Sequence, residues 1–289
     1  MIRKFAFSAA VALLAASTTL TAARAETKPA AVLKHYSELA HAKFEDSLIS
    51  AQSLEKAVDA LIANPSEETL KAAKAAWIAA RVPYQQTEVY RFGNSAVDDW
   101  EGKVNAWPLD EGLIDYVDPS YGTESDENAL YTANIIANPK IKVNGKTLDT
   151  TKITTKTLRS LHEAGEIEAN VATGYHAIEF LLWGQDTNGT GPGAGTRPYT
   201  DYSKTECTNG NCDRRAAYLK AATALLVADL KDMVVAWGPK GKATRTVEAN
   251  GKKGLSAILT GMGSLSYGEL AGERMKLGLL LHDPEEEHD

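Results

Sequence analysis

A short apolar stretch of the chain carries two side chains that could bind a metal ion together. Within residues 174–184, His176 and Glu179 are the only acidic or basic residues. Positions three apart lie on the same face of a helix, and the surrounding apolar side chains would bury most of that helix. A buried carboxylate is unfavourable unless it is paired, hydrogen-bonded or bound to a metal. Imidazole and carboxylate together are therefore a common part of a metal site.

The same two residues also have a purely structural interpretation. Glu179 could pair with a buried arginine, and His176 could be a histidine of the core, because structural ion pairs also perturb buried groups. In addition, two ligands do not complete a metal site. The spacing alone leaves both interpretations open.

A second predicted helix carries charges on an otherwise aromatic face. Its start is predicted at residues 64–67, with Asn64 as the cap and Pro65 in the first turn. The helix should run to about residue 92, with a bend at Pro83. One of its faces carries, at positions i, i+4, i+7 and i+11, Trp77, Arg81, Tyr84 and Glu88.

These two helix faces could form one site, because His176, Glu179 and Trp183 follow the same spacing. If the faces pack together, Glu88 and Arg81 come close to His176 and Glu179, as in other carboxylate and imidazole sites of helical bundles. Glu88 would then be the third metal ligand. The residues lining such a site would include Arg81, Tyr84 and Trp183. The alternative is a network without a ligand, in which Arg81 neutralises both carboxylates.

Residues 93–126 are predicted to form a long loop region that closes over this site. The region contains Trp107, Asp110 and Asp115. Loops of this length in compact domains are often functional, so we expect Trp107 and Asp110 to line the site. Taken alone, an aspartate in a loop is more often a turn residue or a helix cap.

The overall pattern predicts an all-α fold, a helical bundle with long crossing loops and one small β-hairpin. The hairpin is predicted at residues 141–148, where Asn144 and Gly145 favour a type I′ turn. Further helices are predicted at residues 30–63, 126–137, 155–163, 166–183, 213–237 and 253–282.

The N-terminus resembles a signal peptide for export. Arg3 and Lys4 precede an apolar segment, and residues 23–25 fit the rule for signal cleavage, so we expect the mature chain to begin at Glu26. The formal charge is −7, and loss of the three basic residues of the signal makes it −10. Such a charge argues against a nucleic-acid partner.

The mature chain contains two cysteines, Cys207 and Cys212. After export they face an oxidising compartment, where thiols form disulfides. A two-cysteine metal clip is the alternative. We favour a disulfide, because no third or fourth sulfur is available for a metal.

Several long segments resemble one protein family. The string of residues 174–184, glycine and tryptophan included, resembles the GxHxxE signature of the imelysin family. Residues 185–199 resemble the loop that follows this signature in imelysin-like, iron-regulated proteins, and residues 207–215 continue the likeness. The resemblance implies an imelysin-type helical domain over residues 26–289, with its site around His176 and Glu179. In such relatives the acidic stretch at residues 283–289 lies inside the domain, so we expect the chain to be incomplete at its C-terminus.

The resemblance implies two alternative functions. One is an exported, periplasmic metal-binding protein linked to iron uptake or iron regulation. The other is a metallopeptidase of the cell envelope, in which Glu179 and His176 would be catalytic. A third class is an envelope interaction protein whose buried charges are structural.

The chemistry favours metal binding. A zinc peptidase needs about three protein ligands, an activated water and a general base, and the chain has no HExxH or HxxEH sequence. An oxygen-rich site with one imidazole suits iron or another divalent cation. We therefore expect a divalent or ferric ion, iron first and zinc as the alternative, and an iron-uptake or outer-membrane system as the partner.

Overall fold

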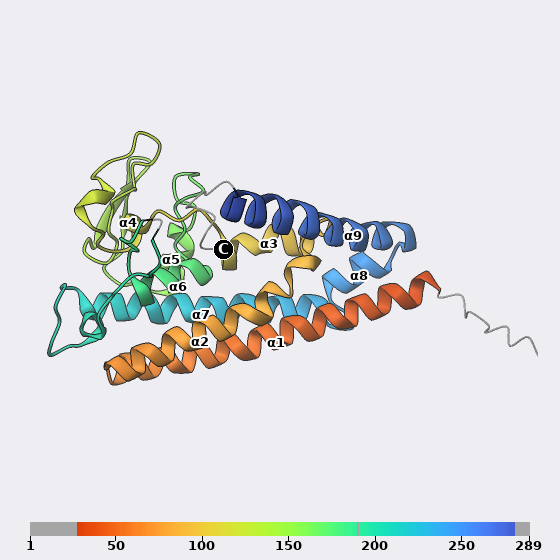
Figure 1. Cartoon of the computed structure of the whole chain (residues 1–289), viewed down its shortest axis with the longest axis horizontal. Helices are drawn as coiled ribbons and strands as arrows, with labels where there is room; N and C mark the ends of the chain where they lie inside the picture. The colour runs from red at the N-terminus through yellow and green to blue at the C-terminus, as the bar shows by residue number, and fades with distance from the viewer. Residues whose placement is uncertain (1–27, 190, 281–289) are drawn as a thin grey trace, which may run out of the picture.

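Three helices form the base of the molecule. The computed structural model describes residues 28–189 and 191–280. Helix α1, Pro29–Ala63, runs antiparallel to α2, Glu67–Gln85, and α7, Cys212–Trp237, packs along α1 (Figure 1). The predicted all-α class is confirmed, because within the described ranges the only sheet has two strands.

The chain reverses direction between α1 and α2. Asn64 closes α1 rather than opening α2. Ser66 caps α2 instead: its hydroxyl accepts from the backbone N–H of Thr69, and the Thr69 hydroxyl accepts from the N–H of Ser66. The start predicted at Asn64 was therefore wrong by two residues, because this reciprocal cap satisfies the first free N–H groups of α2.

Helix α2 also ends earlier than predicted. Pro83 has no N–H and disturbs the last turn. The backbone N–H and hydroxyl of Thr87 both bond to the carbonyl of Tyr84, which closes a turn. Glu88 then opens a short 3-10 helix, η1, Glu88–Tyr90. The prediction of a continuous helix to residue 92, which placed Glu88 on the same face as Arg81, was wrong.

The region predicted as a long loop contains two helices. Asn94 caps α3, Ser95–Asn105, and α4, Glu111–Ile114, follows a cis peptide bond between Trp107 and Pro108. A 3-10 turn, η2, spans Pro119–Tyr121. Residues 126–137 form turns rather than the predicted helix. Their N–H groups at positions 134–136 donate to carbonyls of α4, which holds them in a non-helical path.

The predicted hairpin is confirmed. Strand β1, Lys140–Val143, pairs antiparallel with β2, Lys146–Asp149. Asn144 and Gly145 have φ angles of 48° and 74°, the left-handed values that a type I′ turn requires. Helix α5, Thr155–Leu161, follows and is capped by the Thr154 hydroxyl.

The helix with the His–Glu pair is shorter than predicted. It is α6, Gly174–Trp183, and residues 166–173 approach it as a loop. Gly174 has a φ of 86°, and a Cβ at this position would lie 2.5 Å from the carbonyl oxygen of Val104. Only glycine fits such a left-handed, close contact. The first glycine of the GxHxxE string is therefore where the chain enters the helix against α3.

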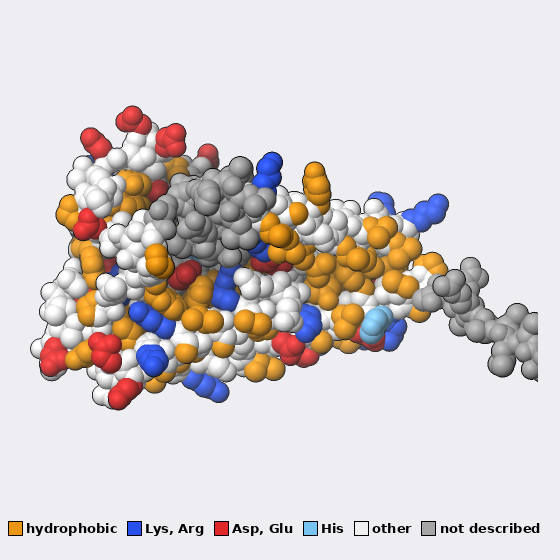
Figure 2. All heavy atoms as spheres, viewed as in Figure 1, with side chains coloured by type: hydrophobic (Ala, Val, Ile, Leu, Met, Phe, Trp, Pro, Cys, Tyr) orange, Lys and Arg blue, Asp and Glu red, His pale blue; other side chains and the backbone are white. Residues whose placement is uncertain are grey.

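The C-terminal part crosses back over the bundle. After the 3-10 helix η3, Tyr199–Tyr202, and helix α7, the chain forms α8, Lys242–Glu248, then α9, Gly251–Gly263, and a π-helical stretch, η4, Ser264–Leu280. The prediction missed α8, and the end of the helix predicted at 253–282 lies outside the described residues. Figure 2 shows hydrophobic side chains gathered where α8 and α9 lie beside α1. None of the described helices is long and apolar enough to cross a membrane.

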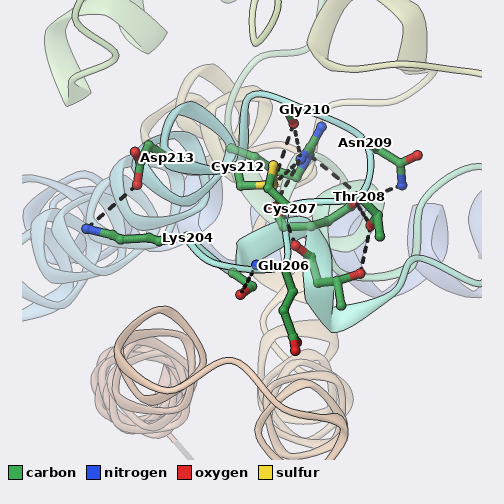
Figure 3. Close-up of a disulfide and its surroundings, with 12 residues drawn as sticks. Lys204, Glu206, Cys207, Thr208, Asn209, Gly210, Cys212 and Asp213 are labelled. Carbon is green, nitrogen blue, oxygen red and sulfur yellow. Dashed lines mark hydrogen bonds and ion pairs between the residues drawn. A yellow bond between two sulfur atoms is a disulfide. The ribbon is translucent and has the colours of Figure 1, made fainter.

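The predicted disulfide between Cys207 and Cys212 is confirmed. It closes the loop in front of α7 (Figure 3). Within this loop the carbonyl of Gly210 accepts from Arg215 at 3.0 Å, and the amide of Asn209 donates to Asp201 at 2.7 Å. The disulfide therefore fixes a loop whose polar groups complete a buried ionic network.

Removing the disulfide should lower the free energy of unfolding. The sequence separation is 5, and the bond restricts the unfolded chain by about 2 kcal/mol for so short a loop. We expect the Cys207→Ser, Cys212→Ser double variant to lose about that amount in urea unfolding. Wild type treated with a reducing agent should show the same loss. Unchanged stability in both samples would contradict this expectation.

Candidate functional site

The His–Glu pair of α6 is assembled as one contact. The Nδ1 atom of His176 lies 3.3 Å from Oε2 of Glu179. The His176 side chain is buried, whereas that of Glu179 is 35% exposed. The prediction that both groups would be largely buried thus holds for the imidazole only. The carboxylate faces a cavity.

The imidazole of His176 is held mainly by packing. Its ring lies 4.9 Å from the ring of Trp107, at an interplanar angle of 53°. Its Nε2 atom is buried and, in the described part of the chain, has no hydrogen-bond partner. The contact with Glu179 is thus the ring's polar anchor.

The cavity beside this pair has a volume of about 250 Å³. Its walls come from α4, α6, the segment before α4, the 3-10 turn η2 and the glycine-rich loop after α6. They are formed by Trp107, Leu109, Glu111, Tyr121, His176, Glu179, Phe180, Trp183, Gly184, Asp186, Gly193, Ala194 and Gly195. Trp107 and Trp183, both predicted to line the site, are among them.

Three carboxylates give this cavity a negative charge. They belong to Glu111, Glu179 and Asp186, and none of the described residues that line it is a lysine or an arginine. Burial raises the pKa of Glu111 to about 7; Asp186 and Glu179 add to this rise, and Arg197 opposes it. The carboxylate of Asp186 accepts hydrogen bonds from the backbone and side chain of Asn188.

The pKa of Glu111 predicts a pH dependence of stability. The folded pKa of about 7 exceeds the ordinary 4.5 because the fold favours the neutral carboxyl of Glu111 over the ionised one. The stability that this neutral form provides is complete below pH 4.5 and is lost as the pH rises through 7. Glu111→Gln should therefore raise the free energy of unfolding of the metal-free protein by roughly 1–3 kcal/mol at pH 8. The gain should be much smaller at pH 5. Urea unfolding at both pH values measures this, and an equal gain at both would contradict it.

Arg81 and Tyr84 lie behind the site rather than in it. Arg81 stacks over the rings of Trp77, Tyr84 and Tyr175 at 5.1–5.7 Å, and it donates to the side chain of Asn105. Trp77 donates to the carbonyl of Tyr175 at 3.0 Å. The two predicted faces therefore do meet, but through aromatic rings. The alternative network, in which Arg81 neutralises Glu88 and Glu179, does not form either, because the guanidinium is held by these rings and by Asn105.

Glu88 belongs to a different cavity. Its carboxylate pairs with Arg274 of η4, with Nη1 and Oε2 3.1 Å apart. It lines a polar cavity of about 290 Å³, which shares Trp107 with the first cavity. Glu101 lines the same cavity and accepts from Asn105 at 3.0 Å. The prediction that Glu88 is a third ligand beside His176 was wrong, because the turn after Pro83 directs the carboxylate of Glu88 toward η4.

The two aspartates of the predicted loop have structural roles. Asp110 accepts a hydrogen bond from the side chain of Asn128, and its neighbour Glu111 faces the cavity instead. Asp115 is fully buried and binds Arg197 and Arg215. Neither aspartate closes over the His–Glu pair, so the prediction of Asp110 as a lining residue was wrong.

Sequence reasoning missed Glu111 and Asp186. Both stand next to residues that were singled out, Glu111 beside Asp110 and Asp186 just after the GxHxxE string. The sequence signal for them was their position, since each of these two acidic residues flanks an apolar stretch of the chain. Among the described residues, no three His, Cys, Asp or Glu side chains are arranged to hold one ion. The protein thus offers a two-residue donor pair with further carboxylates at the cavity wall.

Comparison with known proteins identifies the family of this chain. The model of the imelysin family matches residues 40–289. The chain belongs to the imelysin family. It is 36% identical over 64 residues to iron-regulated protein A of Synechococcus elongatus, a match that covers 22% of this chain and 18% of that protein.

A solved structure supports the fold of this imelysin-family chain. It was described as an iron-regulated protein A precursor from Parabacteroides distasonis, and it matches with a TM-score of 0.54 at 19% identity. The match covers 87% of this chain and 59% of that one. The matches therefore span less than two thirds of either relative's length.

Proposed function

We propose that this protein binds a divalent or ferric ion, iron first and zinc as the alternative, through His176 and Glu179. The observation that carries the proposal is the 3.3 Å separation of Nδ1 and Oε2. An ion about 2.0–2.2 Å from each atom, at tetrahedral or octahedral angles, keeps its donors about 3.0–3.5 Å apart. The pair therefore fits one ion without rearrangement of α6.

The surroundings of the pair support a cation. The carboxylates of Glu111, Glu179 and Asp186 face the same cavity, and carboxylate oxygens suit hard cations such as iron. The two relatives are called iron-regulated proteins, which supports an iron-related role. We further propose export to the periplasm or cell envelope, with an iron-uptake or outer-membrane system as the partner. The predicted signal peptide, residues 1–25, lies outside the described residues.

A metallopeptidase is the alternative that the experiment must separate. Peptide hydrolysis at a zinc site requires about three protein ligands, an open position for water and a general base. The described residues provide two adjacent donors, and if Glu179 binds the ion it cannot also act as the base. Metal binding without efficient peptide hydrolysis is therefore the function that the geometry supports best.

Metal analysis of the protein without a polyhistidine tag tests this proposal. We expect about one equivalent of ion to be retained after equilibrium dialysis against iron(II) without oxygen, or against zinc. We also expect no efficient cleavage of unstructured peptide substrates by the same sample. No retained metal would contradict the proposal. Strong peptide cleavage that is abolished in Glu179→Gln would instead establish the peptidase.

A further inference from the structure

The cavity is much larger than a metal ion. Its volume is about 250 Å³, whereas a water molecule in the liquid occupies about 30 Å³. An ion between His176 and Glu179 would therefore leave space for several additional non-hydrogen atoms.

Apart from the acidic residues and His176, the lining of the cavity is mostly apolar and aromatic. Trp107, Leu109, Tyr121, Phe180 and Trp183 contribute to it. Trp183 also packs edge-on against Trp77, with ring centroids 5.4 Å apart, so its ring has a fixed orientation. Apolar walls of this kind favour organic groups over water, and flat rings stack on them.

The glycine-rich loop fixes one edge of the cavity. A Cβ at Gly195 would lie 2.2 Å from the carbonyl oxygen of Gly184. The next part of the loop is tied back to α6, because the N–H of Arg197 donates to the carbonyl of Trp183 at 2.7 Å. The rim is therefore held close to the aromatic wall by backbone contacts.

The donor count leaves coordination positions unfilled. An ion with four to six donors takes two from His176 and Glu179, and the described residues offer no third one arranged around the same point. With the described residues in this arrangement, the remaining donors would be supplied by water or by a bound small molecule. The aromatic walls favour the small molecule.

We propose that the cavity takes its metal ion as a one-to-one complex with a small aromatic, bidentate chelator. The proposal rests on the proposed function of the same site. The negative cavity selects a complex with net positive charge, so the chelator should be neutral or carry one negative charge. The ion contacts His176 and Glu179, and the chelator ring packs against Trp183 and Tyr121.

Equilibrium dialysis with matched chelators tests this inference. Pyridine-2-carboxylate and glycinate both bind metals through one nitrogen and one carboxylate oxygen, but only the first carries a ring. The protein is dialysed against iron(II), without oxygen, alone or with either labelled chelator, and both retained iron and retained chelator are counted. Each chelator without iron serves as the control.

We expect protein, iron and pyridine-2-carboxylate to be retained in a one-to-one-to-one ratio, with at least a tenfold preference over glycinate. Trp183→Leu and Tyr121→Leu, which remove a ring but keep an apolar side chain, should each reduce this preference. Binding of iron alone should stay within about threefold of wild type in both variants. Trp183→Phe should restore most of the preference.

Two other outcomes are distinguishable. Retention of iron with no chelator, or equal retention of both chelators, would overturn this inference and leave the proposed metal site intact. Retention of neither iron nor chelator would overturn both. Preserved thermal unfolding of the leucine variants shows that a lost preference does not arise from loss of the fold.

Discussion

Replacement of Arg215 by methionine should lower the free energy of unfolding by about 3–5 kcal/mol. Arg215 on α7 is fully buried and donates to both carboxylate oxygens of Asp115, at 2.6 and 3.0 Å. It also donates to the carbonyls of Asp201 and Gly210, at 3.0 Å each. The variant would leave the carbonyls of Asp201 and Gly210 buried without this donor, and Arg197 would be the remaining cationic partner of Asp115. Removing one partner of a buried ion pair is strongly destabilising.

The same network makes the protein sensitive to acid. Burial would raise the pKa of Asp115, but the hydrogen bond from Arg215 and the positive charge of Arg197 hold this pKa below its usual range. Asp115 therefore stabilises the fold above its unfolded pKa of about 3.9, and this contribution is lost as the pH falls through the lower folded value. The difference between wild type and Arg215→Met should shrink under those acidic conditions.

A matched control lies on the same helix. Lys220 forms an exposed ion pair with Asp59 at 2.6 Å, and exposed pairs contribute about 0–1 kcal/mol. Lys220→Met should therefore change the free energy of unfolding by less than about 1 kcal/mol in the same urea titration. Similar effects of the two substitutions would contradict the role assigned to Arg215.

Loss of His176 should reduce metal affinity by a factor on the order of 100 or more, equivalent to about 2.7 kcal/mol. His176→Ala removes one of the two donor atoms that lie 3.3 Å apart. The apolar residues of α6 remain, so the helical circular dichroism spectrum should be largely unchanged. Calorimetric titration with iron(II), without oxygen, and with zinc measures the effect.

The control is a histidine far from the cavity. His35 lies on α1 with a side chain that is 72% exposed, and His35→Ala should bind metal as wild type does. Glu179→Gln should weaken binding to a similar degree as His176→Ala, because it removes the second donor. Equal affinities of wild type and His176→Ala would show that the ion binds elsewhere.

Local features of the fold could be predicted from the sequence. The apolar pattern placed α6 and α7, Asn144-Gly145 placed the hairpin, and two cysteines after a predicted signal peptide indicated the disulfide. Each of these depends on neighbouring residues or on a simple rule of chemistry. These features could therefore be predicted without knowledge of long-range packing.

The details of the site depended on long-range contacts and on turns. Glu88 seemed to continue the face of Arg81, but the turn after Pro83 directs it to Arg274, which is 186 positions away in sequence. Asp110 and Glu111 are adjacent, and the geometry of α4 decides which of them faces the cavity. Helical spacing in the sequence cannot predict these two side-chain directions, because the spacing rule applies only as far as the helix continues.

Anomalous diffraction from crystals of the iron-loaded protein tests the central claim most directly. The ion should give a peak about 2.0–2.2 Å from both Nδ1 of His176 and Oε2 of Glu179. A peak beside Glu88 and Glu101, or the absence of any peak at the His176–Glu179 pair in crystals that contain bound iron, would contradict the account.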